Sequence, residues 1–438
     1  MLSANTYGKT KTYADMFKLV YRNRLYYSSY LFLKKSVETN TRVSEKAARR
    51  VIDIIHPSVF IHDPELDKFI NTNTQLDFAV GLRRFFLNDF NVAEKKLTRI
   101  DKKHSMYVEA NYLLGLVELR KNKLETAEKY FTRCVAASSS KRMTRLKPES
   151  YVRTFRNRCI QQVGRINYAQ KDFKKSLRIY NYVKSDDYIW PRFLMDKAWT
   201  YYMLGQNERA LGSVITYKAP LLQRFMVPEA NYIRGLIYYD MCYFEKTESI
   251  YNEFNQSTWR FRKIAQTASR NRLLRLIVSR DVPENENDQF LYYYLKGFKK
   301  DIRYMSFIEA RKQIAIEIKR LSKIKSMKQA KIFLEYLYYY QKAVKEDFQD
   351  FLKSLTNDYY TQIVDARKAF VKLNLMVSLK KRKQIKKKNT DEFEDTFAEK
   401  SLSNIPNIDE KFIWDFQGGF WADELGDYAV ALENQCQN

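Results

Sequence analysis

The sequence has few residues that break helices. Only 11 glycines and 8 prolines occur among its 438 residues, and residues 298–405 contain neither. Both residue types disfavour helix interiors, proline most strongly, so long stretches without them favour continuous helices. Because 45% of the residues are hydrophobic, the chain can also bury a core. The sequence therefore predicts an all-α protein.

Side chains that carry chemistry are scarce as well. The chain has three histidines, His56, His62 and His104, and their spacing is not that of metal ligands on one helix. It contains no phosphate-binding loop, no G-x-S-x-G nucleophile motif and no H-E-x-x-H zinc motif. We therefore predict a protein that is not an enzyme and has no catalytic residues, no metal site and no cofactor.

The four cysteines, Cys134, Cys159, Cys242 and Cys436, lie far apart and form no C-x-x-C pair. This spacing is typical neither of a zinc site nor of a disulfide framework. We expect Cys134 and Cys242 to be small buried thiols on helices. Cys436, near the end of the chain, is expected to be the more reactive thiol.

Long apolar runs are also absent. A membrane-spanning helix needs about 20 predominantly apolar residues, and no such run occurs. The opening residues, MLSANTYGKTKTYADM, lack the charged and apolar regions of a secretory signal. If Met1 is the true start, the expected location is the cytoplasm. If the sequence is instead a mature form from which a signal peptide has been removed, the expected location is the periplasm or cell envelope.

What the sequence does contain is a repeated pattern of small residues. Five copies begin with a small residue, at Gly81, Gly115, Gly164, Ala198 and Gly235. Twelve positions later each copy has a second small or β-branched residue, at Ala93, Ala127, Ser176, Ala210 and Thr247. Four copies have a large residue 16 positions after the first, at Leu97, Phe131, Tyr180 and Tyr251. The copies lie 34, 49, 34 and 37 residues apart, and we interpret AASSSKRMTRLKPES in the longest gap as an inserted loop.

This pattern resembles the tetratricopeptide repeat (TPR), a family built from pairs of antiparallel helices. The resemblance covers residues 77–255 and implies a right-handed superhelical α-solenoid. The two small residues of a copy would face each other where its two helices cross. The resemblance also implies a concave face that binds other proteins. Residues beside the first small position are the candidate contacts, namely Asn111, Arg165, Tyr202 and Arg234.

Positive charge is unevenly distributed along the chain. The formal net charge is +27, residues 291–390 carry 25 Lys and Arg against 9 Asp and Glu, and residues 391–438 carry 2 against 12. Seven of the nine residues 380–388 are basic. Such a run can bind nucleic acid, an anionic membrane or an acidic protein, or it can be a solvated linker. It lacks interleaved aromatic residues that would stack on bases, so we favour the linker and expect protein partners with acidic surfaces.

The C-terminal stretch IWDFQGGFWADELGDYAVALENQC is both acidic and aromatic. It resembles a C-terminal signature of TPR proteins in the cell envelope of gliding and predatory bacteria, including gliding-motility-type proteins. That resemblance implies an exported, periplasmic scaffold. Because burying one large aromatic side chain contributes about 2 kcal/mol, we predict that this segment docks on the helical body. Its anchors would be Trp414, Phe420 and Trp421.

These features predict both the organisation and the function of the chain. The function is that of a non-catalytic scaffold for complex assembly; a basic helical repeat that binds nucleic acid or an anionic surface is the alternative. The predicted parts are an N-terminal helical cap (1–76), a TPR-like solenoid (77–280), a long-helix region (281–379), a charged linker (380–400) and an acidic aromatic C-terminal segment (401–438).

Overall fold

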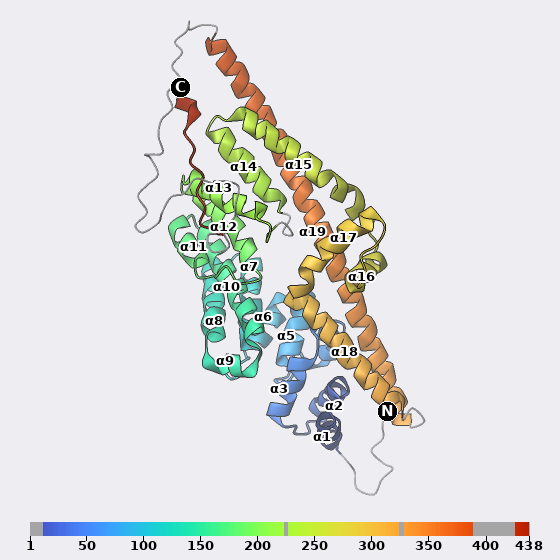
Figure 1. The fold of residues 1–438 in the computed structure, drawn as a ribbon. Coiled ribbons are helices and arrows are strands. Elements are labelled where there is room, and N and C mark those ends of the chain that lie inside the picture. The colour runs from blue at the N-terminus through green and yellow to red at the C-terminus, as the bar shows by residue number, and fades with distance from the viewer. Residues whose placement is uncertain (1–11, 223–226, 324–327, 389–424, 438) are drawn as a thin grey trace. The chain divides into compact units, whose positions relative to one another are not determined.

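The computed structural model describes residues 12–222, 227–323, 328–388 and 425–437 (Figure 1). Every regular element in these ranges is a helix, so the all-α prediction is confirmed. No helix in the described part of the chain is both long and apolar enough to span a membrane. Close contacts divide the chain into two units, Met1–Ile166 with Phe298–Phe351 and Asn167–Gly297 with Leu352–Asn438.

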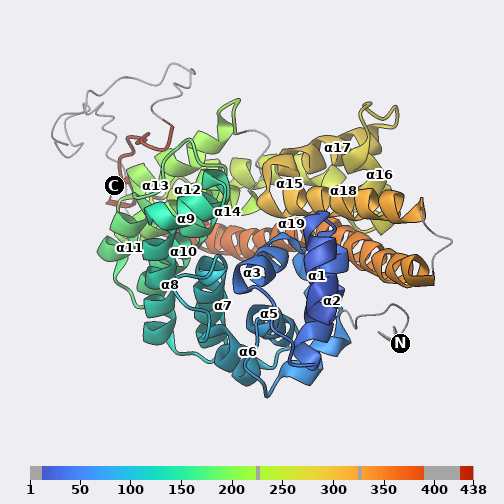
Figure 2. The same ribbon diagram turned by 90° about the horizontal axis from the view of Figure 1, so that it is seen from below.

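The first unit contains the N-terminal helices and the first repeats. Its helices are α1 (Tyr13–Arg22), α2 (Tyr26–Glu38), α3 (Glu45–Ile54), α4 (Pro57–Ile61), η1 (Pro64–Phe69), α5 (Asp77–Phe86), α6 (Phe90–Leu97), α7 (Tyr107–Arg120), α8 (Leu124–Ser138), α9 (Lys141–Leu146), most of α10 (Glu149–Ala169), α18 (Ile302–Ser322) and the first part of α19 (Lys328–Lys388). Figure 2 shows α18 beside that first part of α19, where Phe307 stacks on Phe348 with ring centroids 5.1 Å apart.

The second unit contains the later repeats and the end of the chain. Its helices are α11 (Phe173–Tyr180), α12 (Trp190–Met203), α13 (Asn207–Ile215), η2 (Thr216–Lys218), α14 (Pro228–Asp240), α15 (Phe244–Ala265), α16 (Arg270–Val278), α17 (Glu286–Lys296), the remainder of α19 and η4 (Gln435–Gln437). The short helix η3 (Gly297–Lys300) begins at the boundary between the units.

The same turn ends the first helix of all five predicted repeats. The residue seven positions after the first small residue has a positive φ in each copy, at Asn88, Asn122, Lys171, Gly205 and Cys242. The next backbone N–H donates to the carbonyl five residues back, as from Asp89 to Arg84 and from Tyr243 to Tyr238. This bond pattern is a standard way of ending a helix with one left-handed residue. The repeats identified in the sequence are therefore structural repeats.

Gly81 and Gly115 are small because a side chain of the following helix fills the space next to them. A Cβ atom on Gly115 would lie 2.5 Å from a ring carbon of Phe131, and one on Gly81 would lie 2.8 Å from Cγ of Leu97. Both neighbours are the buried large residues found 16 positions later. The second small residues, Ala93 and Ala127, are also buried. The resemblance implied that Gly115 faces Ala127, whereas the atoms nearest to a Cβ atom on Gly115 belong to Phe131.

In the last repeat, α19 fills the corresponding space. A Cβ atom on Gly235 would lie 2.8 Å from a ring carbon of Phe370 on α19. The rings of Tyr251 and Phe254 on α15 also pack against Phe370, with centroids 5.6 and 5.2 Å away. Thr247, twelve positions after Gly235, donates its hydroxyl proton to the Gly235 carbonyl at 3.3 Å. In the second unit, α19 therefore packs on α14 and α15 as the next helix of the stack.

Buried charged groups fix the N-terminal helices of the first unit. Glu317 on α18 accepts hydrogen bonds from the backbone N–H groups of Tyr27 and Ser28 at 2.9 and 3.0 Å, and so caps the start of α2. Burial raises the pKa of Glu317 to about 6. Lys34 on α2 pairs with Asp63 at 2.7 Å, and both side chains are buried. Buried charges of this kind need such partners because leaving one unpaired is strongly destabilising.

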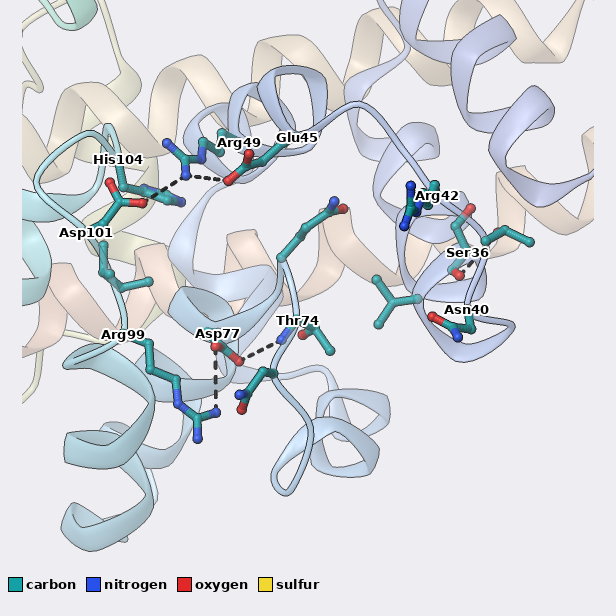
Figure 3. A pocket seen from close by; sticks show the side chains of 15 residues that line it. Ser36, Asn40, Arg42, Glu45, Arg49, Thr74, Asp77, Arg99, Asp101 and His104 are labelled. Carbon is teal, nitrogen blue, oxygen red and sulfur yellow. Dashed lines mark hydrogen bonds and ion pairs between the residues drawn. The ribbon is translucent and has the colours of Figure 1, made fainter.

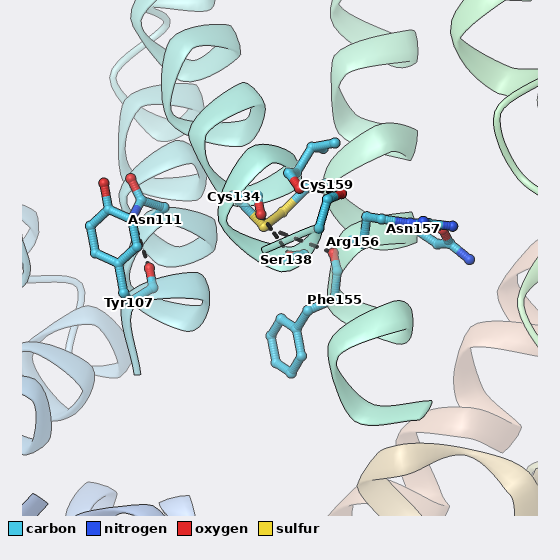
Figure 4. The surroundings of a disulfide bond; sticks show 10 residues. Tyr107, Asn111, Cys134, Ser138, Phe155, Arg156, Asn157 and Cys159 are labelled. Atoms are coloured by element: carbon cyan, nitrogen blue, oxygen red, sulfur yellow. Dashed lines mark hydrogen bonds between the residues drawn. A yellow bond between two sulfur atoms is a disulfide. The ribbon is translucent and has the colours of Figure 1, made fainter. Parts of the chain in front are cut away.

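All four cysteines form disulfides, which corrects the prediction of free thiols. Cys134 on α8 is bonded to Cys159 on α10 in the first unit (Figure 4). Cys242, after α14, is bonded to Cys436 in the second unit. The Cα atoms of the two pairs lie 6.3 and 5.1 Å apart, within the usual range for disulfides. The prediction was wrong because helix packing, rather than sequence spacing, brings these residues together; the pairs are separated by 25 and 194 positions.

The described part of the C-terminal segment, residues 425–437, lies against helices of the second unit. Leu425 is buried, and Gly426, at φ 94°, lies so close to Trp190 that a Cβ atom would be 2.8 Å from its ring. The Val430 N–H donates to the Glu208 carbonyl at 3.0 Å, and the Gln435 N–H donates to the Met241 carbonyl at 3.2 Å. The predicted anchors Trp414, Phe420 and Trp421 lie outside the described residues.

The segment predicted as a charged linker is helical in its first part, because α19 continues through Lys388. Near its end, Lys381 forms an ion pair with Glu248 at 2.9 Å, and the Lys380 ammonium lies 4.2 Å from the centre of the Tyr239 ring. At least these two cations therefore have local partners on α14 and α15. The rest of the predicted linker, from residue 389, lies outside the described residues.

Candidate protein-binding surfaces

The four predicted partner contacts differ in how accessible they are. Asn111 on α7 is buried, and its side-chain amide donates to the Tyr107 carbonyl at 2.7 Å (Figure 4). Arg165 on α10 is exposed. Tyr202 on α12 and Arg234 on α14 are half-buried. Arg234 pairs with Glu253 on α15 at 3.6 Å. Arg165 and Tyr202 therefore keep part of their surface in water, whereas Asn111 does not.

Tyr202 belongs to a group of three rings on α12 and α14, which we call the aromatic face: Trp199, Tyr202 and Tyr232. The ring centroid of Trp199 lies 6.0 Å from that of Tyr202 and 6.3 Å from that of Tyr232. All three side chains are only half-buried. The ring of Phe370 on α19 packs edge-to-face against the ring of Tyr232, with centroids 5.6 Å apart. The sequence pattern pointed to Tyr202 alone, because the contact between Trp199 and Tyr232, 33 positions apart, is a product of helix packing.

Two carboxylates border the aromatic face. The indole N–H of Trp199 donates to Glu229 at 2.6 Å, and the Tyr202 hydroxyl donates to Asp240 at 2.5 Å. Burial, followed by the hydrogen bond to Asp240, raises the pKa of the Tyr202 hydroxyl, which therefore stays protonated at neutral pH. Neither carboxylate forms an ion pair with a lysine or arginine among the described residues. Rings beside unneutralised carboxylates favour a cationic side chain, since a cation gains from both.

A polar cavity of about 620 Å³ lies in the first unit, between the end of α2, the start of α3 and the loops around α5 and α7 (Figure 3). Its lining residues are Ser36, Val37, Asn40, Thr41, Arg42, Glu45, Arg49, Asn73, Thr74, Gln75, Asp77, Arg99, Ile100, Asp101 and His104. Arg49 pairs with Glu45 and with Asp101, at 2.5 and 3.0 Å, and Arg99 lies 3.9 Å from Asp77. Because these arginines already face carboxylates, they do not form a concentrated anion-binding site.

Two buried histidines make the stability of the first unit depend on pH. Burial lowers the pKa of His56 and of His104 to about 4. Each ring accepts a backbone N–H through Nδ1, from Ser58 and from Met106. Both rings are therefore neutral at pH 7, which fits a structural role rather than acid–base catalysis.

We predict that stability falls as the pH drops from about 6.5 towards 4. In that range the unfolded chain binds more protons at these histidines than the folded chain does, and the effect is at most about 3 kcal/mol per histidine. Glu317 opposes this loss of stability only between its ordinary pKa and about 6, because its pKa is raised in the folded chain. Urea unfolding at a series of pH values measures the slope of the free energy of unfolding against pH. The double variant His56→Asn, His104→Asn should flatten it, and His62→Asn, at an exposed residue paired with Asp347, should not. An unchanged slope in the double variant would refute this origin.

Among the described residues, no group of three or more His, Cys, Asp or Glu side chains is arranged to hold a metal ion. No family model matches the chain, and no curated protein matches it. Among solved structures, the apo form of RapI matches with 10% sequence identity and a TM-score of 0.38, covering 76% of this chain and 98% of RapI. A score this low does not establish a common fold.

Proposed function

We propose that the protein is a non-catalytic scaffold of the TPR type, which holds other proteins in a complex. The observation that carries the proposal is the regular series of helix pairs with one recurring turn, ending in helices whose exposed faces carry aromatic rings. Such stacks present an extended surface and place no reactive groups on it by themselves. Protein partners contact such surfaces chiefly through buried aromatic and arginine side chains.

Within the second unit, the aromatic face is the proposed partner contact. Its three rings keep part of their surface in water although they are large, and hydrogen bonds to Glu229 and Asp240 hold Trp199 and Tyr202 in place. A partner that covers them would gain apolar burial with little loss of side-chain entropy, because the rings are already ordered. A segment with lysine or arginine side chains fits this surface best. In the first unit, Arg165 remains a separate candidate contact.

The double variant Trp199→Ala, Tyr202→Ala should weaken partner recovery at least about tenfold, because interface tryptophans and tyrosines often contribute 2 kcal/mol or more. Quantitative pull-down from native cells, read by mass spectrometry, measures the loss. Tyr182→Ala is the matched control, since Tyr182 is an equally large ring of the second unit and is 72% exposed. Full recovery of every partner by the double variant would exclude the aromatic face. Charge reversal at Arg165 and Arg234 tests the two predicted arginine contacts in the same assay.

We further propose that this scaffold works in an oxidising compartment, such as the bacterial cell envelope. The two disulfides support this location, because cytosolic thiols are kept reduced while exported proteins retain disulfides. The resemblance of the C-terminal stretch to envelope proteins supports it independently. Acid quenching of native cells, followed by thiol alkylation and mass spectrometry, should find no modified cysteine on the intact chain. Modification of all four cysteines would exclude the oxidising compartment while leaving the scaffold role untouched.

Binding of nucleic acid or of an anionic surface is the second candidate function, and the basic run at residues 380–388 favours it. The partners of Lys380 and Lys381 on α14 and α15 reduce the positive charge that such a ligand would meet. Salt dependence separates the two functions. Binding to phosphates weakens linearly in a plot of log affinity against log salt, with a slope that counts the phosphate contacts. Contact through the aromatic face involves the two carboxylates Glu229 and Asp240, so its affinity should fall with a much smaller slope.

A further inference from the structure

The last part of α19 has two different apolar faces. Ala366, Phe370, Leu373 and Val377 are buried, and Phe370 and Leu373 lie next to Gly235 on α14. Val371, Leu375 and Leu379 follow one another at intervals of four on a different side of the helix. These three, which we call the outer row, are 54%, 62% and 51% exposed. Residues four apart on a helix are neighbours on its surface, so the outer row is one continuous apolar strip.

Four cationic side chains lie along the same strip: Arg367, Lys368, Lys372 and Arg382. At 100° per residue, they project within about 40° of one or another member of the outer row. All four side chains are exposed. Among the described residues, Lys368 faces Asp365 at 3.8 Å, and no acidic partner is present for Arg367, Lys372 or Arg382. The strip therefore combines exposed apolar surface with concentrated positive charge.

The terminal helix of a helical stack normally has a polar outer face, because nothing packs on it. Here α19 is the helix that covers α14 and α15, yet its outer row places three branched aliphatic side chains in water. Contiguous exposed apolar surface next to charge is typical of protein interaction sites. We propose that the outer row of α19 is a second docking surface, separate from the aromatic face, and that its ligand is an acidic amphipathic helix of another protein.

Charge complementarity favours this ligand over a second copy of the chain and over an anionic membrane. A second copy of the chain would bring four cations against four cations, and like charges facing each other at an interface are unfavourable. An anionic membrane would attract the cations, but insertion requires apolar side chains that protrude. Each member of the outer row already has 38–49% of its surface covered. A helix with carboxylates on both sides of an apolar row pairs its charges with the four cations and covers the three aliphatic side chains.

The test uses the full-length, disulfide-bonded protein and a fluorescent model peptide, an acidic amphipathic helix with leucines at i, i+4 and i+8 flanked by glutamates. Fluorescence anisotropy should show binding that weakens at least about tenfold in Leu375→Ser, Leu379→Ser, and also in Arg367→Glu, Lys372→Glu. The matched control is Lys342→Glu, Lys345→Glu, which reverses two exposed charges on the same helix and should change affinity less than about twofold. Far-UV circular dichroism confirms that each variant is folded.

Three results would overturn the proposal. The first is equal weakening in the control, which would show that only the overall positive charge matters. The second is a membrane result: the outer-row variants lose binding to vesicles that contain phosphatidylglycerol, but they bind the acidic peptide as well as the natural protein does. The third is a dimer that dissociates in Leu375→Ser, Leu379→Ser, as judged by analytical ultracentrifugation. Because none of these variants touches Trp199 or Tyr202, failure here leaves the aromatic face untested and the scaffold proposal standing.

Discussion

Replacing both Cys242 and Cys436 with serine should lower the free energy of unfolding of the second unit by about 3–5 kcal/mol. The disulfide joins residues 194 positions apart, and cross-links over long loops remove more conformational entropy from the unfolded chain than cross-links over short ones. It also holds the C-terminal segment, whose other described attachments include the backbone hydrogen bonds of Val430 and Gln435. Thermal and denaturant unfolding of the oxidised protein and of the double variant measure the difference.

Limited proteolysis gives a second measure of the same change. In the double variant the segment 425–437 should be removed rapidly, whereas it should resist cleavage in the disulfide-bonded protein. Cys134→Ser, Cys159→Ser is the matched control, since that disulfide spans 25 positions and should contribute less, about 3 kcal/mol. It should also leave the C-terminal segment protected. Equal protease resistance with and without the Cys242–Cys436 bond would contradict its role in holding the segment.

Replacing Gly115 with leucine should destabilise the first unit by about 1–3 kcal/mol through overpacking. Even a single Cβ atom at this position would lie 2.5 Å from the buried ring of Phe131, so α7 and α8 must move apart or the ring must leave its site. Gly297→Ala is the control, because no atom lies within 4 Å of the added methyl group there and the backbone is helical. An unchanged melting temperature for Gly115→Leu would contradict the close crossing of the two helices.

The contact between Gly115 and Phe131 can also be tested as a pair. Phe131→Leu alone removes buried volume and should destabilise the protein. In the background of Phe131→Leu, however, Gly115→Ala should cost less than it does in the natural sequence, since the smaller side chain leaves room for the methyl group. Residues in contact show such non-additivity of about 0.5–3 kcal/mol. Strict additivity in a double-mutant cycle would show that the two residues do not share this space.

The repeat pattern was predictable because it depends on local geometry. A helix after which the chain turns back sharply needs a left-handed residue at its end, and Asn88, Asn122 and Gly205 adopt that conformation readily. Two helices that cross closely need a small residue at the crossing, and a large residue 16 positions later fills the space. These requirements recur with the repeat, so they are visible in one sequence. The all-α architecture and the scaffold hypothesis follow from the same features.

The contacts between repeats were not predictable, because they join residues far apart in the chain. The spacing of Cys242 and Cys436 gave no sign of a bond, and the absence of C-x-x-C pairs led to the opposite conclusion. Asn111 was predicted on a binding face, but it is buried because its helix is covered on that side. The outer row of α19 has the spacing of a core face; only the packing of Phe370 against Gly235 reveals which apolar face is buried.

The sequence by itself determined that the chain is helical and that its helices come in repeated pairs. These properties depend on backbone preferences and on side-chain size within about 20 neighbouring residues. Tertiary structure alone decided which cysteines pair, which aromatic rings meet on α12 and α14, and which apolar surface of α19 stays in water. Those outcomes depend on how separate helices pack, and one sequence holds no local record of that packing.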